Sequence, residues 1–188
     1  IDAGIDFIGD LGNSTNPDDD QFQVSKNAIA NIAVVGDWIA IPDGPPGLEG
    51  TWNQGEANLE IASPLGLLVD LSDANTGPGA PSPTNGYTVV GNVGDDTITG
   101  SGDNDTLSGG IGEDEITGDE RLGGPVINQV FTFTGGEDTI SGGDDDDELV
   151  GDLRLGAGAV TIKTLSSIIG GDDIIDGDDD EDEIVGDL

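Results

Sequence analysis

Residues 91–117 read Gly-Asn-Val-Gly-Asp-Asp-Thr-Ile-Thr, Gly-Ser-Gly-Asp-Asn-Asp-Thr-Leu-Ser and Gly-Gly-Ile-Gly-Glu-Asp-Glu-Ile-Thr, which are three consecutive nine-residue units. Each unit opens with Gly, carries Asp at its sixth position and has one aliphatic residue at its eighth. Glycine permits the positive φ angles of a tight loop. We expect the aliphatic residue to be the single inward side chain of a very short strand. The stretch therefore predicts short strands joined by tight acidic loops.

These units resemble the RTX (haemolysin-type calcium-binding) nonapeptide repeat, Gly-Gly-x-Gly-x-Asp-x-U-x, where U is aliphatic. The resemblance covers about half of the chain. It implies an all-β fold, a parallel β-roll or β-helix solenoid with Gly- and Asp-rich loops, and Ca²⁺ as cofactor, with several ions bound. The sequence departs from the pattern at Asp103 and Asp145, which stand where Gly is expected at the fourth position, and residues 121–133 and 153–167 interrupt the nonapeptides.

The charge of the chain also indicates bound cations. Forty acidic residues stand against four basic ones, a formal net charge of −36. Such a chain repels itself unless cations bind, so we expect bound cations to be a folding requirement. Nucleic acid and anionic membrane surfaces are poor partners for it. No Cys is present and no apolar run has the length of a membrane span. The chain starts at Ile1 without a visible signal peptide, so we expect a mature or excised segment of a longer product.

The two halves of the chain differ in composition. Residues 1–90 carry 13 acids and one base, whereas residues 91–188 carry 27 acids and three bases. The first half also holds both Trp residues and eight of the nine prolines. We predict an N-terminal β-rich part with Pro-rich loops over 1–90, forming the first coils or a cap, and a calcium-binding solenoid over 91–188. Apolar segments 28–41 and 59–71 read as strands, with a short helix over 26–40 as the alternative.

A longer repeat runs through the second half. Similar segments begin at Asp105, Asp138 and Asp173, with offsets of 33 and then 35 residues. One interpretation is a coil of 33–35 residues with about three strands. The alternative follows the RTX resemblance, in which two nonapeptides make one 18-residue turn. That shorter register would hold for 91–117, with longer coils afterwards.

The long register stacks like residues on one another. It predicts two inward aliphatic ladders, Leu107–Ile140–Ile175 and Ile116–Leu149–Ile184, and two aspartate ladders, Asp105–Asp138–Asp173 and Asp114–Asp147–Asp182. Two unit charges about 5 Å apart repel by roughly 3 kcal/mol at an effective dielectric near 20. A hard dication between the carboxylates removes this conflict. Ca²⁺ accepts six to eight irregular oxygen ligands, whereas Mg²⁺ requires a stricter octahedron.

The candidate metal ligands form three groups. The first comprises the sixth-position aspartates Asp96, Asp105, Asp114, Asp138, Asp147, Asp173 and Asp182; the second comprises the loop residues Gly94, Asp103, Gly112, Asp145 and Asp180; the third is the ladder Asp119, Asp152 and Asp187. The competing interpretation of the first group is a solvated acidic surface. For the third group it is a turn-forming Gly-Asp step.

Catalysis finds little support in the sequence. Without His or Cys the chain lacks the zinc-protease motif, a Ser-His-Asp triad and a thiol nucleophile. No EF-hand loop occurs. A carboxylate pair could hydrolyse glycosides, but here none stands out among so many. Trp38 and Trp52 are expected in the core rather than in a ligand site. We therefore predict that the chain is not an enzyme.

The ends of the chain suggest a role. Residues 6–11 echo 148–153 and 183–188, so 1–11 is interpreted as the end of a coil and copies are expected to associate head to tail or side by side. We predict a secreted structural protein, extracellular or at the cell surface, that folds on Ca²⁺ and builds a filament, surface layer or adhesin stalk. The alternative is the calcium-binding secretion and folding module of a larger secreted enzyme. A glycan or another cell-surface ligand is a further candidate partner, and membrane insertion is not expected.

Overall fold

A computed structural model describes residues 5–11, 21–43, 50–82, 84–122, 126–155 and 161–186. All the regular elements in these ranges are strands. They are β1 (Ile5–Leu11), β2 (Gln23–Val24), β3 (Ile29–Val34), β4 (Trp38–Ile39), β5 (Trp52–Asn53), β6 (Glu56–Ile61), β7 (Leu68–Asp70), β8 (Thr88–Val93), β9 (Thr97–Thr99), β10 (Thr106–Ile111), β11 (Glu115–Thr117), β12 (Glu120–Leu122), β13 (Val126–Thr134), β14 (Thr139–Asp144), β15 (Glu148–Val150), β16 (Leu153–Leu155), β17 (Thr161–Ile169), β18 (Ile174–Asp178) and β19 (Glu183–Val185).

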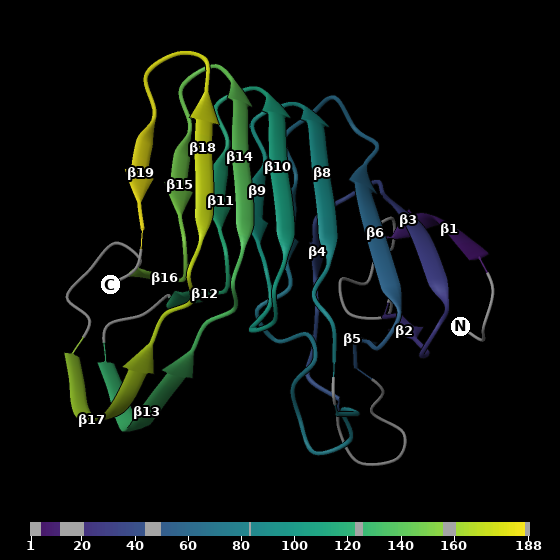
Figure 1. Ribbon diagram of the computed structural model, residues 1–188. Coiled ribbons are helices and arrows are strands. Elements are labelled where there is room, and N and C mark those ends of the chain that lie inside the picture. The colour runs from purple at the N-terminus through teal and green to yellow at the C-terminus, as the bar shows by residue number, and fades with distance from the viewer. Residues whose placement is uncertain are drawn as a thin grey trace.

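Two parallel sheets face each other along the length of the molecule (Figure 1). The larger has the order β1-β3-β6-β8-β10-β14-β18, and the smaller has the order β4-β7-β9-β11-β15-β19. From β8 onward each strand of the larger sheet is followed by one of the smaller sheet, so the chain winds as a coil. The predicted all-β parallel solenoid is therefore confirmed.

The register shows two coil lengths in one solenoid. Thr106 pairs with Thr88, 18 residues earlier in the chain, and Tyr87 lies against Asp105 with the same offset. Thr139 then pairs with Thr106, an offset of 33 residues, and Ile174 pairs with Thr139, an offset of 35 residues. The short register thus holds near residues 91–117 and the long register follows it, so both interpretations are confirmed, each in its own part of the chain.

The long coils are short coils with an insertion at one loop position. Their extra length over the short coil equals the length of the stretches 120–134 and 153–169. Gly136 lies against the backbone of Asp103, and Gly171 against that of Gly136, so the loop resumes in register after each insertion. The insertions pair with each other through β12–β16 and β13–β17 and project below the two sheets (Figure 1). An insertion therefore leaves the stacking of the sheets intact.

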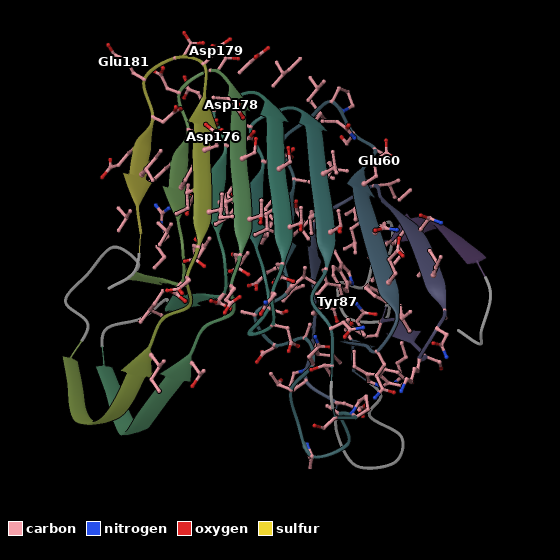
Figure 2. All side chains as sticks on the ribbon, in the orientation of Figure 1. Glu60, Tyr87, Asp176, Asp178, Asp179 and Glu181 are labelled. Atoms are coloured by element: carbon pink, nitrogen blue, oxygen red, sulfur yellow. The ribbon has the colours of Figure 1, made fainter. Side chains whose placement is uncertain are left out.

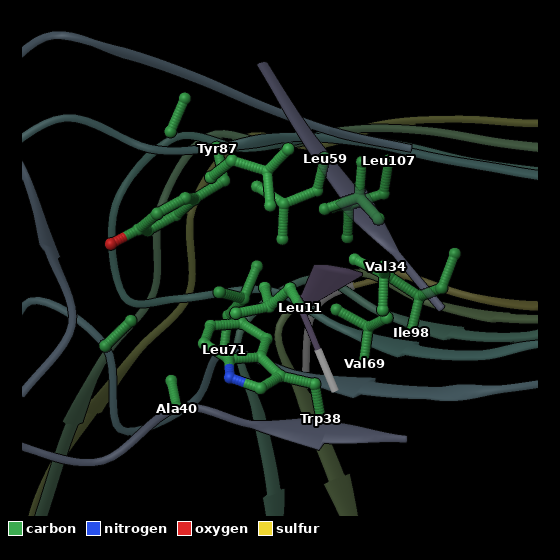
Figure 3. Close-up of a cluster of buried hydrophobic side chains, with 14 of the residues drawn as sticks. Leu11, Val34, Trp38, Ala40, Leu59, Val69, Leu71, Tyr87, Ile98 and Leu107 are labelled. Atoms are coloured by element: carbon green, nitrogen blue, oxygen red, sulfur yellow. The ribbon is translucent and has the colours of Figure 1, made fainter. Parts of the chain in front are cut away.

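The core consists of inward rows, one side chain from each strand. The larger sheet contributes Ile32, Leu59, Val89, Leu107, Ile140 and Ile175, and the smaller contributes Trp38, Val69, Ile98, Ile116, Leu149 and Ile184. All are buried except Ile175 and Ile184 in the last described coil. Figure 3 shows Leu59, Leu107, Val69 and Ile98 together in this core. Both predicted aliphatic ladders are confirmed.

Residues before position 91 contribute strands to the same two sheets. β3, β6 and β8 lie in the larger sheet beside β10, and β4 and β7 lie in the smaller sheet beside β9. The helix considered over 26–40 is wrong, because these residues contain the strands β3 and β4. Trp38 is buried and stacks on Phe22 with ring centroids 5.4 Å apart. Its expected place in the core is confirmed.

The first strand lies in a different sheet from the one that its sequence suggests. Residues 6–11 echo 148–153, whose strand β15 belongs to the smaller sheet. In the structure β1 instead pairs with β3 in the larger sheet, with Ile5 opposite Ile29. The interpretation of 1–11 as the end of a coil is therefore wrong. A two-residue alternation fits either sheet equally well, so sequence similarity alone does not choose between them.

Candidate metal centre

One aspartate ladder follows the upper edge of the sheets, in the loops that join the larger sheet to the smaller one. It contains Asp96, Asp114, Asp147 and Asp182. From Asp114 onward, each carboxylate accepts a hydrogen bond from the backbone N–H of the aspartate one coil earlier. The N–Oδ1 distances are 2.7 Å from Asp96 to Asp114, 2.8 Å from Asp114 to Asp147 and 3.1 Å from Asp147 to Asp182. Figure 2 shows Asp178, Asp179 and Glu181 around the last of these loops.

A second ladder runs along the lower edge and is built in the same way. The N–H of Asp105 donates to Asp138 at 2.7 Å, and that of Asp138 donates to Asp173 at 3.0 Å. At its start, the N–H of Tyr87 donates to Asp105 at 2.5 Å. Both predicted stacks of aspartates are therefore confirmed as neighbours in space. Asp96 begins the upper ladder in the same manner and accepts the N–H of Leu67 at 2.8 Å.

In several of these side chains the second carboxylate oxygen is buried without a hydrogen-bond donor. This holds, within the described part of the chain, for the Oδ2 atoms of Asp96, Asp114, Asp138 and Asp147. Each of these residues exposes at most 3% of its surface. A buried carboxylate oxygen without a donor is costly unless a cation or a proton is nearby. These four atoms therefore favour a cation over a merely solvated acidic surface.

The glycine that opens each unit makes room for the aspartate five residues later. A Cβ built on Gly91 would stand 2.7 Å from Oδ2 of Asp96, and one on Gly109 would stand 2.6 Å from Cγ of Asp114. Neither distance is compatible with a real side chain. The first-position glycine is thus needed for close approach of the carboxylate to the backbone.

Burial makes these carboxylates hard to ionise without a counterion. Desolvation, with smaller contributions from neighbouring carboxylates, raises the pKa of Asp96 from 3.8 to about 6 and the pKa values of Asp114 and Asp138 to about 7. The backbone donors described above lower the pKa of each but do not offset burial. Burial likewise raises the pKa of Asp105 and Asp147. A cation beside these carboxylates would therefore favour their ionised form at neutral pH.

The fourth loop position has a left-handed backbone in several coils. The φ angles are 119° at Gly94, 131° at Gly112, 81° at Asp145 and 84° at Asp180. Asp tolerates this region better than most residues, so it can stand in for Gly there. Asp103 differs, since its carboxylate accepts a hydrogen bond from the side-chain amide of Asn75 at 2.7 Å. The side chains of Asp145 and Asp180 are exposed, and their assignment as metal ligands stays a prediction.

The fifth loop position was not among the predicted ligands. Its side chains accept hydrogen bonds from the following coil, the opposite direction to the sixth-position aspartates. Asp95 accepts from the N–H of Glu113 at 3.3 Å, and Asp146 accepts from that of Glu181 at 3.0 Å. Asn104 accepts from the N–H of Glu137 at 3.2 Å. The signal was present as an Asp or Asn at the fifth position of three units.

The third predicted ladder is also buried. Asp119 and Asp152 are each 1% exposed, and the N–H of Asp119 donates to the carbonyl of Asp152 at 3.2 Å. Asp119 accepts from the N–H of Gly136, and Asp152 accepts from that of Gly171 at 2.8 Å. Desolvation and the charge of Asp138 raise the pKa of Asp119 to about 9. The third member of this ladder, at position 187, lies outside the described residues.

The donor set suits a cation with oxygen ligands. In the described ranges, no three His, Cys, Asp or Glu side chains converge as a ready metal-binding group. An ion at these loops would draw its ligands from these carboxylates and from backbone carbonyl or water oxygens. Irregular, all-oxygen coordination of this kind fits Ca²⁺ better than Mg²⁺. The residues present therefore fit the expected calcium sites.

A cationic side chain already bridges part of the acidic surface. Arg154 contacts Glu115 at 3.2 Å and Glu148 at 2.7 Å, two residues that face each other on β11 and β15. Beside them lies a groove of about 320 Å³, lined by Glu113, Asp114, Glu115, Asp146, Asp147, Glu148, Glu181 and Glu183. No repeat pattern connects Arg154 to these two partners, so its role could not be predicted from the sequence.

Comparison with known proteins agrees with this geometry. The family model of the RTX calcium-binding nonapeptide repeat, in 4 copies, matches residues 88–120 and 134–153. The chain carries RTX calcium-binding repeats. The two matched ranges contain the ladder residues Asp96, Asp105, Asp114, Asp138 and Asp147, and the gap between them falls on the first insertion.

The chain is similar to a curated protein named "S-layer protein" from Synechocystis sp. (strain ATCC 27184 / PCC 6803 / Kazusa), with 51% identity over 96 residues. The matched region is 51% of this chain and 5% of the relative, so the chain corresponds to a small part of that protein's length. No solved structure matches the chain. Within the described ranges no helix has the length and apolarity of a membrane span.

Proposed function

We propose that this RTX segment folds on Ca²⁺ and is a structural building block of a secreted or cell-surface assembly, such as a surface layer. The observation that carries the calcium requirement is the set of buried Oδ2 atoms of Asp96, Asp114, Asp138 and Asp147, which have no donor among the described residues. Calcium at extracellular, millimolar levels would fold the chain, whereas submicromolar calcium would leave it expanded for export. The name of the Synechocystis relative supports the surface-layer assignment.

The proposal makes the segment structural rather than catalytic. The chain contains no His and no Cys. The sixth-position carboxylates accept backbone hydrogen bonds through Oδ1, and those from Asp96 to Asp147 are buried, so they are poorly placed to act on a substrate. If the segment belonged to a larger secreted enzyme, it would serve that enzyme as a folding and secretion module. A catalytic domain in the same precursor would favour this alternative.

The last described coil offers a surface for assembly. Among the described strands, β18 and β19 each pair on one side only, and Ile174, Ile184 and Val185 are 67%, 49% and 40% exposed. Parallel edge strands with exposed apolar side chains invite another strand to pair. In the proposal, a further coil, supplied by a neighbouring copy or by another part of a longer chain, stacks on this edge and continues both sheets.

A calcium titration followed by far-UV circular dichroism and light scattering tests both parts of the proposal. We expect the β-signal to rise cooperatively with Ca²⁺ and scattering to rise after it. Val185→Lys, which puts a charge on the edge strand, should abolish the rise in scattering but keep the β-signal. Leu65→Lys is the matched control, because Leu65 is 73% exposed and lies outside the strands.

Each part of the proposal can fail separately. A chain whose β-signal ignores Ca²⁺ would refute calcium-dependent folding. A calcium-loaded chain that stays monomeric at high concentration would refute assembly through this edge.

A further inference from the structure

The two insertions differ in charge from the coils around them. The stretches 120–134 and 153–169 contain three of the four basic residues of the chain and one of its forty acids. These residues are Arg121, Arg154 and Lys163, and Glu120. The strands β13 and β17 within the insertions contain no acid at all. Almost all of the negative charge therefore lies outside the insertions, in which bases outnumber acids.

The strands of the insertions are also rich in apolar residues. β13 reads Val-Ile-Asn-Gln-Val-Phe-Thr-Phe-Thr, and β17 reads Thr-Ile-Lys-Thr-Leu-Ser-Ser-Ile-Ile. Their register places Phe131 opposite Leu165 and Phe133 opposite Ile168. Ile169, the last residue of β17, is 56% exposed. The pair β13–β17, here called the insertion sheet, therefore concentrates apolar residues and lacks negative charge.

The insertion sheet stands apart from the two sheets of the solenoid. It consists of two strands, and neither of them pairs with any other strand that the structure describes. Figure 1 shows both strands projecting below the coils. Two strands alone are marginally stable in water and gain stability from a third strand or from a packed layer. Open strand edges also invite pairing. The insertion sheet is therefore a surface on which a partner can dock.

Charge favours a second copy of the chain as that partner. Two copies that meet through their coils bring carboxylates against carboxylates, which repel one another. Two copies that meet through their insertion sheets bring together strands without acids, and the projection of these strands keeps the coils apart. Apolar residues then cover apolar residues. A partner with an acidic surface would instead place charged groups against them, at a cost in desolvation.

We propose that the insertion sheet of one copy packs against the insertion sheet of a second copy, through β13 and β17, and joins the two copies as a dimer. The same surface serves on both copies, so the dimer has two-fold symmetry. This inference rests on the proposed role in assembly, for which it names a second contact.

The second contact has a different direction from the first. Coils stack along the solenoid, through the edge formed by β18 and β19, whereas the insertion sheet projects across that direction (Figure 1). Stacking along the solenoid alone builds single filaments. The contact between insertion sheets joins such filaments side by side in pairs. Lateral joining of this kind is a requirement of a layer, and a single stalk does without it.

The test uses the full chain with Val185→Lys, which leaves the insertion sheet unchanged and blocks stacking through the edge. Sedimentation velocity at saturating Ca²⁺ measures the mass of this variant. We expect a dimer, which adds little to light scattering compared with a growing assembly. The dimer should persist as NaCl is raised from about 0.05 to about 0.5 M, because salt screens charges and leaves apolar contacts intact.

Two further changes in this background remove the contact in different ways. Phe133→Glu places an acid in β13 of both copies and should weaken dimerisation by about tenfold or more. Deletion of 120–134 and 153–169 gives each long coil the length of the short coil and should leave a folded monomer.

The matched control for Phe133→Glu is Val93→Glu. Val93 ends β8 in the larger sheet and is 46% exposed, so the control adds the same charge to a strand outside the insertions. It should keep the dimer. Far-UV circular dichroism checks the folding of each variant, and if either the Phe133→Glu chain or the deletion variant does not fold, the other one decides.

The outcomes separate this inference from the proposed function. A folded Val185→Lys chain that sediments as a monomer at high concentration overturns the inference and leaves assembly through the edge standing. A dimer that dissociates as salt rises overturns it too, because attraction between charges would then hold the copies together. Equal weakening by Phe133→Glu and Val93→Glu, or a deletion variant that still dimerises, has the same consequence. If the β-signal ignores Ca²⁺, calcium-dependent folding fails, and sedimentation of that folded chain still decides whether the dimer exists.

Discussion

Asp114 accepts a hydrogen bond of 2.7 Å from the backbone N–H of Asp96, one short coil earlier, and keeps its other carboxylate oxygen buried without a donor. Oδ1 of Asp114 thus joins two neighbouring coils, and Oδ2 is the atom available to a cation. The remaining ladder aspartates repeat the hydrogen bond between coils along both edges of the sheets. In the proposed calcium-bound chain, single side chains therefore couple folding to ion binding.

Removing the charge of Asp114 should weaken this coupling. Asp114→Asn keeps an acceptor for the N–H of Asp96 but removes the charge that attracts a cation. We expect the Ca²⁺ concentration at the folding midpoint to rise about tenfold, equivalent to about 1.4 kcal/mol, in a titration followed by circular dichroism. Glu113→Gln is the control, because Glu113 is the neighbouring residue in the same loop. Equal shifts in the two variants would contradict a specific role for Asp114.

Without calcium, stability should fall as pH rises. The folded-state pKa values are raised from 3.8 to about 6 for Asp96, about 7 for Asp114 and Asp138, and about 9 for Asp119. The folded chain therefore binds more protons than the unfolded chain above pH 4, and the stability present at low pH is lost as pH rises toward these values. In a chelator, far-UV circular dichroism should therefore show more β-structure at pH 5 than at pH 8.

Calcium should suppress that pH dependence. Because a cation takes the place of the protons, the free energy of unfolding at saturating Ca²⁺ should no longer fall between pH 5 and pH 8. Circular dichroism in chelator and urea denaturation in Ca²⁺, each at pH 5 and pH 8, measure the two pH dependences. A chelated chain that is more stable at pH 8 than at pH 5 would show that the aspartates are not buried as described.

The first-position glycines should tolerate no side chain. A Cβ on Gly109 would stand 2.6 Å from Cγ and 2.8 Å from Cβ of Asp114, whereas a Cβ on Gly102 would meet only the carbonyl of Thr134 at 3.8 Å. We expect Gly109→Ala to destabilise the calcium-loaded chain by about 1–3 kcal/mol, as overpacking does, and Gly102→Ala to have a much smaller effect. Thermal unfolding of both variants in Ca²⁺ measures this. Similar losses would mean that the carboxylate moves aside without cost.

Loss of Arg154 should expose the repulsion between stacked glutamates. Arg154→Met keeps much of the side-chain volume and removes the contacts to Glu115 and Glu148. Since Glu115 and Glu148 are partly exposed, we expect a modest loss, about 1 kcal/mol, that is larger at low salt. Adding Glu148→Gln should recover part of it, as a double-mutant cycle in urea would show. An absence of coupling would mean that the ion pairs contribute nothing to stability.

The stacking of the ladders could be predicted from the sequence because a repeat fixes its own register. Asp105 and Asp138 occupy the same place in similar segments, and stacking one segment on the other brings them together. The sequence also contained both coil lengths. It did not show that the long coils are short coils with insertions, because that follows from how Gly136 and Gly171 return to the loop.

Contacts that do not follow from the repeat could not be predicted from the sequence. The amide of Asn75 binds Asp103, and Arg154 bridges Glu115 and Glu148. The sheet to which β1 belongs could not be predicted either, since the two-residue alternation of its side chains fits both sheets. A repeat predicts what recurs, while a unique contact depends on which side chains the winding brings together.

The insertions at 120–134 and 153–169 depart from the stacked coils and return to them at one loop position. The strands on either side keep their register. In this solenoid, the residues that stack the sheets are separate from the residues of the inserted segments. The two sheets can be extended by adding coils, while the insertions can vary in length and sequence without changing the register of the sheets. A new surface could be grafted at this junction, and each added coil would offer one more point of attachment.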